Sequence, residues 1–267
     1  MGVCRSAYYT WASHINDEPD REEIALYAKL QNVFAVSRKT YGSRRLKMEL
    51  NQAGFAVGRF KVKRLMSKLG LVARYPKRFK VTTNSQHLLE VAPNTLDRRF
   101  EVNAPNQVWT SDISYVWTSQ GWIYVAMIMD LYSRQIVGWA IDDHMRTSLC
   151  VEALKMAFWR KKPAAGLLHH SDRGSQYASY EYRDYLKMMK MEQSMSRKGN
   201  CWDNAPTERF FRSMKYEYLN YERFPTKAAA KLSIIDYFVF YNGQRIHSTL
   251  GYKTPLAFER EFYKQLA

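Results

Sequence analysis

The sequence predicts an α/β protein in which a mixed β-sheet flanked by helices follows a smaller helical region. Two observations lead to this prediction. From residue 107 onward, three strand-like stretches are followed by alternating helix-like and strand-like stretches. Before that, apolar residues recur mostly at helical spacing. The chain has 267 residues, of which 46% are hydrophobic, so it can bury a sizeable core.

Residues 1–72 are expected to form a helical DNA-binding region. Apolar spacing predicts helices over residues 21–37, about 42–53 and about 58–69. Gly54 and Gly70 follow the last two and are typical of helix ends. Two short helices joined by a short turn are typical of a helix-turn-helix.

The charge of the chain points to a polyanionic partner. The formal net charge is +16, and residues 38–80 contain 14 Lys and Arg against one acidic residue, Glu49. A solvated basic face is the ordinary alternative, but so long a run of one sign favours contact with DNA phosphates. The candidate contacts here are Arg44, Arg45, Arg59, Lys61, Lys63, Arg64 and Lys68.

Membrane insertion and disulfide bonding are not expected. The longest apolar run, residues 123–129, is far too short to span a bilayer. The three cysteines are widely spaced, which favours a reducing compartment. We therefore expect a cytoplasmic protein that associates with the nucleoid through DNA.

Residues 73–106 are expected to be a basic and polar linker that becomes ordered on DNA. Pro76, Pro93 and Pro105 interrupt this segment, and it shows no sustained period. Residues 107–219 then form the predicted core. Its expected strands cover 108–118, 122–131, 134–141, 166–170 and 192–196, and its expected helices cover 147–160, 179–190 and 204–218. That order is typical of a ribonuclease-H-like fold, and residues 220–267 are expected to extend it with helices.

Three acidic residues are the candidate catalytic groups and metal ligands. Asp112 lies near the middle of the first expected strand, where Asp is disfavoured. Asp172 lies 60 positions later, at the end of the fourth strand, and Glu208 lies on a later helix. Carboxylate oxygens suit Mg²⁺, with Mn²⁺ as a substitute, and paired ions of this kind promote phosphoryl transfer.

Other side chains compete for these roles. Asp130, Asp142 and Asp203 are alternative carboxylates, whereas His169 and His170 are expected to be structural. Lys215 lies two helical turns after Glu208 and on the same face, so it is placed to meet DNA phosphates. Weaker candidates for DNA contact, each with a solvated surface cation as its alternative, are Arg173, Arg197, Lys198 and Arg212.

Several long stretches resemble the integrase-like DDE transposases of the insertion-sequence-three family, specifically their second-frame product. The matching stretches are residues 41–45, 64–66, 109–113, 130–139, 170–177 and 194–208, together with the C-terminal segment 241–255. The one difference within the first acidic motif is Ser111, where the family commonly has Thr.

The resemblance implies an enzyme with a retroviral-integrase-type core, a triad of Asp112, Asp172 and Glu208, and Mg²⁺. Its implied reaction is cleavage at the ends of the element followed by attack of the freed 3′-hydroxyl on another DNA. It also implies a homo-oligomer on paired DNA ends. The family's first-frame product, separate or fused, is an expected partner because its own helix-turn-helix and zipper-like helix are not seen in this sequence.

Two other functions remain open from the residues. A ribonuclease-H-like DNA nuclease would only hydrolyse, and strand joining distinguishes it from a transposase. A catalytically inactive DNA-binding regulator is the second alternative. The presence of all three acidic residues argues against the regulator.

Overall fold

The computed structural model describes residues 4–14, 20–74, 89–198 and 200–266. The chain divides into two compact units, Met1–Ala73 and Arg74–Ala267. Within the described ranges, no helix is both long and apolar enough to cross a lipid bilayer. Most of the N-terminal half of the expected linker, residues 75–88, lies outside the described residues.

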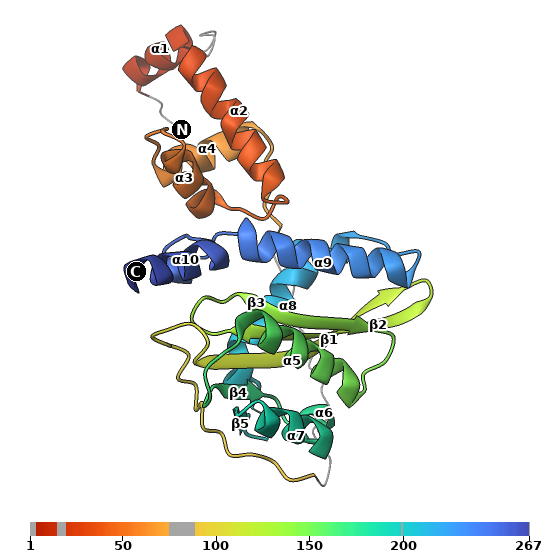
Figure 1. The fold of residues 1–267 in the computed structure, drawn as a ribbon. Coiled ribbons are helices and arrows are strands. Elements are labelled where there is room, and N and C mark those ends of the chain that lie inside the picture. Colours follow the sequence, from red (N-terminus) through yellow and green to blue (C-terminus); the bar gives the residue numbers. More distant parts are fainter. Residues whose placement is uncertain (1–3, 15–19, 75–88, 199, 267) are drawn as a thin grey trace. The chain divides into compact units, whose positions relative to one another are not determined.

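Unit 1 is a small helical unit built around α2 (Arg21–Val36), α3 (Ser43–Gln52) and α4 (Arg59–Lys68) (Figure 1). These helices confirm the three that apolar spacing predicts. Asp20 caps α2 by accepting a hydrogen bond from the Glu23 backbone N–H at 2.6 Å. Helix α1 (Arg5–His14) was not expected, because its aromatic residues follow no clear period. The fully buried side chains of the unit are those of Leu30, Leu46, Leu50 and Val62.

The described part of unit 2 contains one five-stranded mixed sheet in the order β3-β2-β1-β4-β5. Strands β1 (Val108–Thr118), β2 (Gly121–Asp130) and β3 (Ile136–Asp142) are antiparallel neighbours. Strand β4 (Leu168–Ser171) pairs parallel to β1, and β5 (Glu192–Met195) pairs parallel to β4. All five strands were expected, so the mixed sheet predicted from the sequence is confirmed.

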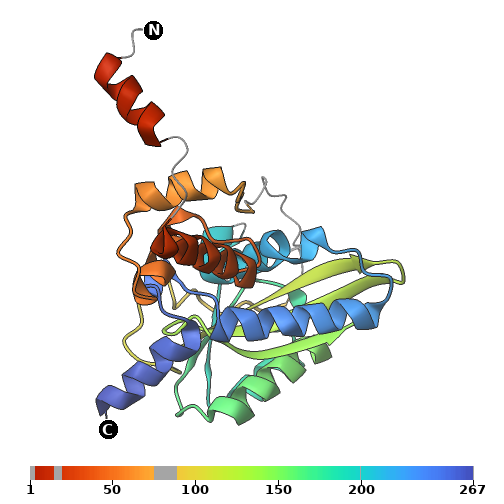
Figure 2. The same ribbon diagram turned by 90° about the horizontal axis from the view of Figure 1, so that it is seen from above.

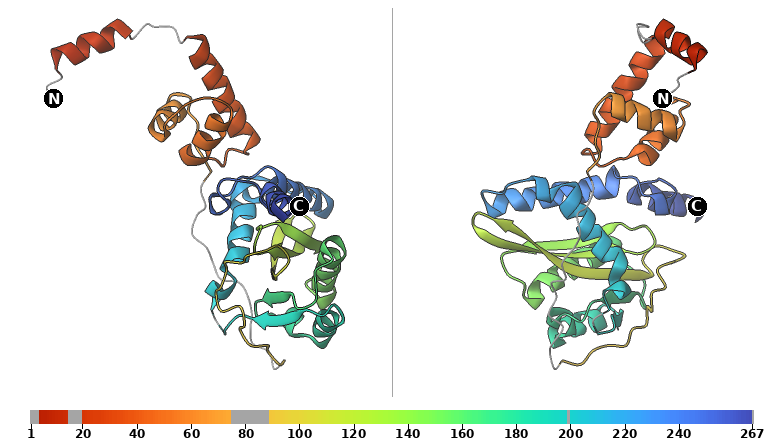
Figure 3. Two further views of the ribbon diagram at one scale, coloured as in Figure 1. Left: turned by 60° about the vertical axis from the view of Figure 1, so that its left-hand side comes forward. Right: turned by 180° about the vertical axis from the view of Figure 1, so that it is seen from behind.

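Helices cover both faces of this sheet. Helices α5 (Thr147–Lys161), α6 (Ser175–Ala178) and α7 (Tyr180–Met188) share one apolar core with it, and α5 lies in front of the sheet in Figure 1. On the other face lie α8 (Ala205–Glu217), η2 (Leu219–Tyr221) and α9 (Lys227–Gly243). Figure 3 shows α8 from behind the sheet, and Figure 2 shows α9 lying over the strands. The remaining elements are η1 (Cys201–Asn204), η3 (Ser248–Leu250) and α10 (Pro255–Leu266).

Strand β3 begins two residues later than expected because of the turn that precedes it. The buried Asp130 carboxylate accepts hydrogen bonds from the Ser133 backbone N–H at 2.8 Å and its hydroxyl at 2.9 Å. Arg134 follows with a φ of 60°, in the left-handed region. These residues therefore form a tight turn, and the ladder to β2 starts at Ile136.

The described part of the expected linker, residues 89–106, belongs to unit 2. The side chains of Leu89, Val91 and Ala92 pack against the core shared with α5. The Met195 backbone N–H donates to the Pro93 carbonyl at 3.2 Å, and the Ser194 hydroxyl accepts from the Leu96 N–H at 3.1 Å. This segment therefore lies along β5, the edge strand of the sheet.

Gly138 lets β3 and α5 approach closely. A Cβ atom at this position would lie 2.3 Å from the Ala153 carbonyl oxygen and 2.7 Å from the Ala157 Cβ. We expect Gly138→Ala to lower the free energy of unfolding of unit 2 by about 3 kcal/mol, because backbone atoms must move to make room. Chemical denaturation followed by circular dichroism measures this change.

A second glycine variant provides the control for that measurement. A Cβ at Gly243 would meet only the Leu256 Cδ1 atom, at an ordinary contact distance of 3.7 Å. Gly243→Ala should therefore change the free energy of unfolding by less than about 1 kcal/mol. Equal stability of the two variants would contradict the steric argument.

Candidate active site

The pairing of β1 with β4 brings Asp112 beside Asp172. The parallel register joins Val108 to Leu168 and Thr110 to His170, a constant offset of 60 residues. Asp112 and Asp172 are separated by the same offset, so the register, continued by two residues, places them opposite each other. Neighbouring strands lie about 4.8 Å apart, so the two side chains start close together.

Glu208 approaches from the helix that covers this face of the sheet. Asp112 pairs across the sheet with Met127, which belongs to the core shared with α8. Paired residues on adjacent strands point to the same face, so Asp112 faces the α8 side. Glu208 lies in the first turn of α8, and that helix packs against β1.

The three carboxylates act electrostatically on one another. Burial and the negative charge of Asp172 raise the pKa of Asp112 well above its ordinary value, and Glu208 raises it further. Burial and Asp172 also raise the pKa of Glu208. Such repulsion favours a bound cation, and three carboxylates are the oxygen donors that Mg²⁺ prefers. The donor set therefore fits a divalent metal ion.

The three side chains do not form a closed set of metal ligands in this structure. Over the described ranges, no group of three or more His, Cys, Asp or Glu residues is placed to hold a metal ion. Asp112 Oδ1 accepts a hydrogen bond from the Ile113 backbone N–H at 2.7 Å. Asp172 Oδ1 accepts one from the Gly174 N–H at 2.9 Å. Those bonds orient both aspartate side chains.

Asn204 links strand β1, which carries Asp112, to helix α8, which carries Glu208. Its Nδ2 donates to the Ser111 carbonyl oxygen at 3.0 Å, next to Asp112. Its Oδ1 accepts from the Thr207 hydroxyl at 2.5 Å, next to Glu208. Sequence analysis missed this residue, because an Asn before Ala-Pro indicates only a helix start. Its position four residues before Glu208, one helical turn, is the signal that was available.

The competing aspartates have other partners. Asp130 is buried in the turn before β3 and also accepts from the Asn106 backbone N–H at 2.7 Å. Asp142 lies at the end of β3, where its carboxylate is 3.3 Å from the His144 ring. Asp203 is fully buried and pairs with Arg197 at 2.9 Å and Arg98 at 2.8 Å. None of these three shares the electrostatic coupling of Asp112, Asp172 and Glu208.

His169 and His170 are buried, and their ring nitrogens lie within hydrogen-bond distance of nearby hydroxyl groups. The His169 Nε2 lies 3.0 Å from the Tyr182 hydroxyl. The His170 ring lies between the hydroxyls of Ser194, at 2.9 Å, and Ser196, at 3.2 Å. Burial lowers the pKa of His169 to about 3 and that of His170 to about 4, so both rings are neutral near pH 7. They occupy the structural positions expected from the sequence.

The cations expected near the site fall into two groups. Lys215 is half-buried on α8, interacts electrostatically with Asp112, and places its Nζ 4.7 Å from the centre of the Tyr115 ring. Arg173 donates from Nε to the Ser196 carbonyl at 2.5 Å, and Arg197 is held by Asp203. By contrast, the side chains of Lys198 and Arg212 are exposed.

A basic surface covers α4 in unit 1. The apolar face of the helix is buried through Val62, Leu65 and Met66. On its other faces the exposed cations are Arg59, Lys61, Lys63, Arg64 and Lys68. Phe60, among them, is 80% exposed. On α3, Arg44 is exposed, whereas the Arg45 guanidinium lies 5.4 Å from the centre of the Tyr41 ring.

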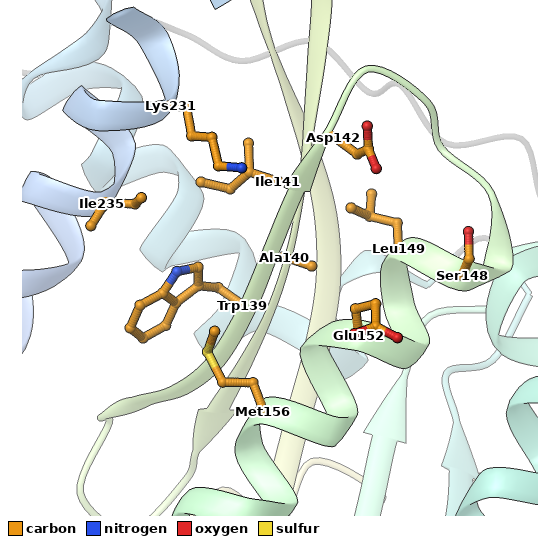
Figure 4. A pocket seen from close by; sticks show the side chains of 10 residues that line it. All are labelled: Trp139, Ala140, Ile141, Asp142, Ser148, Leu149, Glu152, Met156, Lys231 and Ile235. Atoms are coloured by element: carbon orange, nitrogen blue, oxygen red, sulfur yellow. The ribbon is translucent and has the colours of Figure 1, made fainter. Parts of the chain in front are cut away.

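A cavity of about 340 Å³ lies elsewhere in unit 2 (Figure 4). Trp139, Leu149, Met156 and Ile235 supply its apolar wall, at the edge strand β3 between α5 and α9. Strand β2 separates β3 from β1. None of the three coupled carboxylates lines this cavity, so it is separate from the candidate active site.

Family models match most of the chain. The integrase core domain matches residues 102–201, a second integrase core domain matches residues 189–255, and a helix-turn-helix-like domain matches residues 20–79. These matches agree with a helical first unit and a sheet-containing second unit.

Similar proteins are found over the whole length. The uncharacterized 31 kDa protein of insertion element IS600 from Shigella sonnei is 45% identical over 268 residues, covering 100% of this chain and 98% of that protein. Transposase InsF for insertion sequence IS3A from Escherichia coli (strain K12) is 35% identical over 264 residues, covering 98% and 92% of the two chains.

A solved structure shares the fold. A chain of the simian T-cell lymphotropic virus intasome, solved in complex with PP2A regulatory subunit B56 gamma, matches with a TM-score of 0.50. Its identity is 14%, and the match covers 82% of this chain and 70% of that chain. Together with near full-length identity of 35% to InsF, the integrase core and the helix-turn-helix-like domain place this chain in the IS3 family of insertion-sequence transposases.

Proposed function

We propose that this transposase cleaves DNA at the ends of its insertion sequence and joins the freed 3′-hydroxyl to a second DNA. Asp112, Asp172 and Glu208 are the proposed catalytic residues and ligands of Mg²⁺, with Mn²⁺ as a substitute. The observation that supports this most strongly is the β1–β4 register, whose offset of 60 residues, continued by two residues, sets Asp112 opposite Asp172 on the face that α8 covers. Bound metal would activate the attacking oxygen and stabilise the leaving oxygen.

The residues around the carboxylates have complementary tasks. Asp112 and Asp172 are held by backbone N–H groups and would keep a fixed orientation during the reaction. Lys215, which lies beside Asp112, would bind a phosphate of the cleaved strand. Arg173, Arg197, Lys198 and Arg212 are proposed as further contacts near the site, of which the exposed Lys198 and Arg212 are the most accessible.

The partners follow from the same reaction. Double-stranded DNA would bind the basic surface of α4 and the site in unit 2, through contacts weakened by salt. We propose a homo-oligomer on paired DNA ends, acting on DNA in the cytoplasm, with the first-frame product of the element as an additional or fused partner. We also propose that residues 1–72 recognise the ends and that residues 107–219, extended by 220–267, carry the chemistry.

One assay separates this function from its alternatives. Wild-type protein is incubated with Mg²⁺, a target plasmid and a labelled duplex that carries one end of the element, either uncut within flanking DNA or with a free 3′-hydroxyl. Joined product supports the transposase. Hydrolysis of uncut ends without joining would indicate a nuclease, and binding without either product would indicate a DNA-binding regulator.

Asn204 is expected to act as a positioning residue for Glu208. Replacing it with alanine removes the hydrogen bonds to Ser111 and Thr207, so Glu208 would be held less firmly against Asp112. We expect Asn204→Ala to slow cleavage by about 10- to 100-fold and to raise the Mg²⁺ concentration needed for half-maximal rate. Cleavage rates over a Mg²⁺ titration measure both changes.

Asn204→Asp serves as the partial variant. It keeps the oxygen that accepts from Thr207 but loses the donor to Ser111. An intermediate Mg²⁺ requirement would agree with positioning through both bonds. A slower rate with an unchanged Mg²⁺ requirement, together with a lower melting temperature, would show a purely structural role.

A further inference from the structure

Trp202 is an exposed indole on a turn whose next two residues are buried. Its side chain is 70% exposed, whereas Asp203 is 0% and Asn204 is 3% exposed. All three lie in η1, directly before the helix that carries Glu208. Burying an indole would stabilise the fold, and the fold leaves this contribution unused.

The turn beneath Trp202 is firmly anchored. The Asp203 carboxylate accepts from the Arg197 backbone N–H at 2.9 Å, the Arg98 Nε at 2.8 Å and the Asn94 Nδ2 at 3.0 Å. Asn204 holds the next position against the Ser111 carbonyl. The ring therefore projects from a fixed base, which is the requirement for a stacking platform.

The anchoring also fixes the distance to the carboxylates. Consecutive Cα atoms are about 3.8 Å apart, so the backbones of Trp202 and Asn204 lie within about 8 Å of each other. Asn204 is in turn bonded to the residue next to Asp112. The backbone that carries the indole is therefore tied, through Asn204, to the strand that carries Asp112.

The residues around the Trp202 ring indicate what kind of partner it would bind. The Arg98 guanidinium carbon lies 6.0 Å from the centre of the Trp202 ring. Arg197, half-exposed at 48%, and the exposed Lys198 precede it in the same loop. An apolar protein partner would need further apolar neighbours, whereas an aromatic face beside cations suits a nucleobase joined to phosphates.

We propose that Trp202 stacks on an unpaired base of the DNA end, next to the phosphate at Asp112, Asp172 and Glu208. This inference rests on the proposed function, because it takes DNA as the substrate. A base inside a duplex has both faces covered by its neighbours, so stacking of such a base on Trp202 requires that the terminal pairs open. Trp202 would then stabilise the opened end and present its phosphate to the carboxylates.

The test combines protein variants with altered DNA ends. Trp202→Ala and Trp202→Phe are compared with wild type on duplex ends that are fully paired or that lack one base at each of the last four positions in turn. Trp159→Ala is the matched control, since Trp159 is 67% exposed on α5, which packs on the opposite face of the sheet from α8. Two quantities are measured: the rate of strand joining and the affinity for the end in an Asp172→Asn background.

We expect Trp202→Ala to lower end affinity and joining rate about tenfold on paired ends, with Trp202→Phe and Trp159→Ala within about threefold of wild type. On DNA lacking the stacked base, wild type and Trp202→Ala should become equal. A loss with Trp202→Ala that is the same on every DNA end, or no loss at all, would overturn the proposal.

The affinity measurement keeps this inference separate from the proposed function. Affinity in the Asp172→Asn background needs no catalysis, so a base-dependent loss is detectable even if wild type joins no strands. In that case the stacking site would stand and the transposase chemistry would fail. Joining by wild type without a base-dependent effect of Trp202→Ala would give the reverse result.

Discussion

Asp172→Asn is expected to reduce both DNA cleavage and strand joining by at least about a hundredfold. The substitution keeps the shape of the side chain but removes a negative charge that raises the pKa values of both Asp112 and Glu208. The remaining carboxylates would repel each other less and bind a divalent cation more weakly. Gel assays of labelled element ends in Mg²⁺ measure both reactions.

The same variant should retain its affinity for DNA. Loss of one negative charge near the DNA path leaves phosphate binding unchanged or slightly stronger, because the basic surface of α4 is untouched. Asp142→Asn is the matched control, since Asp142 is an Asp at the end of β3 and its side chain is 51% exposed. Equal loss of DNA binding and cleavage in Asp172→Asn would count against a role as a metal ligand.

Much of the sheet can be predicted from the sequence, because its strands have strong local patterns of residue types. The segment Val108–Thr118 is rich in β-branched and aromatic residues, and its predicted bounds match β1. The short β4 was predicted from residues 166–170 and the short β5 from residues 192–196, each between two expected helices. Helices α1 and α6 were not predicted, because α1 has no clear apolar period and α6 spans only Ser175–Ala178.

The candidate site is predictable in part for a different reason. The 60-residue spacing of Asp112 and Asp172 equals the offset of the β1–β4 register, but spacing alone does not reveal which strands pair. The three carboxylates were chosen from their residue types and expected positions, and the family resemblance implies the same three. Local pattern also cannot show that Asp203 is buried between Arg98 and Arg197, because Arg98 lies 105 residues away in the chain.

The C-terminal segment is a second case in which local sequence pattern does not predict contacts with distant residues. The family resemblance includes residues 241–255 but implies no role for them. In the structure the Asn242 amide accepts from the Ile136 backbone N–H and donates to the Ile136 carbonyl, both at 2.9 Å. It thereby satisfies the backbone of the first residue of β3, 106 residues earlier. Such long-range hydrogen bonds depend on the completed fold, so no local pattern predicts them.

The largest effect on stability is expected at the ion pair between Glu217 and Arg245. Glu217 is the last residue of α8, and Arg245 follows α9. The Arg245 guanidinium contacts both carboxylate oxygens, through Nη2 at 2.6 Å and Nε at 2.8 Å. The Tyr237 hydroxyl donates a further bond to the carboxylate at 2.7 Å. Although burial alone lowers the pKa of Arg245, the Glu217 carboxylate raises it overall.

Replacing only Arg245 removes a counter-ion from the buried Glu217 carboxylate. The side chains of Arg245 and Glu217 are only 7% and 13% exposed. We expect Arg245→Ala to lower the free energy of unfolding of unit 2 by about 3–5 kcal/mol, because the Glu217 carboxylate would remain buried without its cation. A fall in melting temperature of about 10 °C, measured by calorimetry, corresponds to that change.

Comparison of single and double variants separates the buried charge from lost packing. Replacing both residues by methionine removes the pair without stranding a charge, so the double variant should be more stable than Arg245→Ala. Tyr237→Phe should cost only about 1 kcal/mol, because it removes one hydrogen bond. If Arg245→Ala were no more costly than Tyr237→Phe, the pair would not hold α8. If Arg245→Ala is far more destabilising than Tyr237→Phe, Arg245 anchors the C-terminal end of α8. The first turn of the same helix carries Glu208.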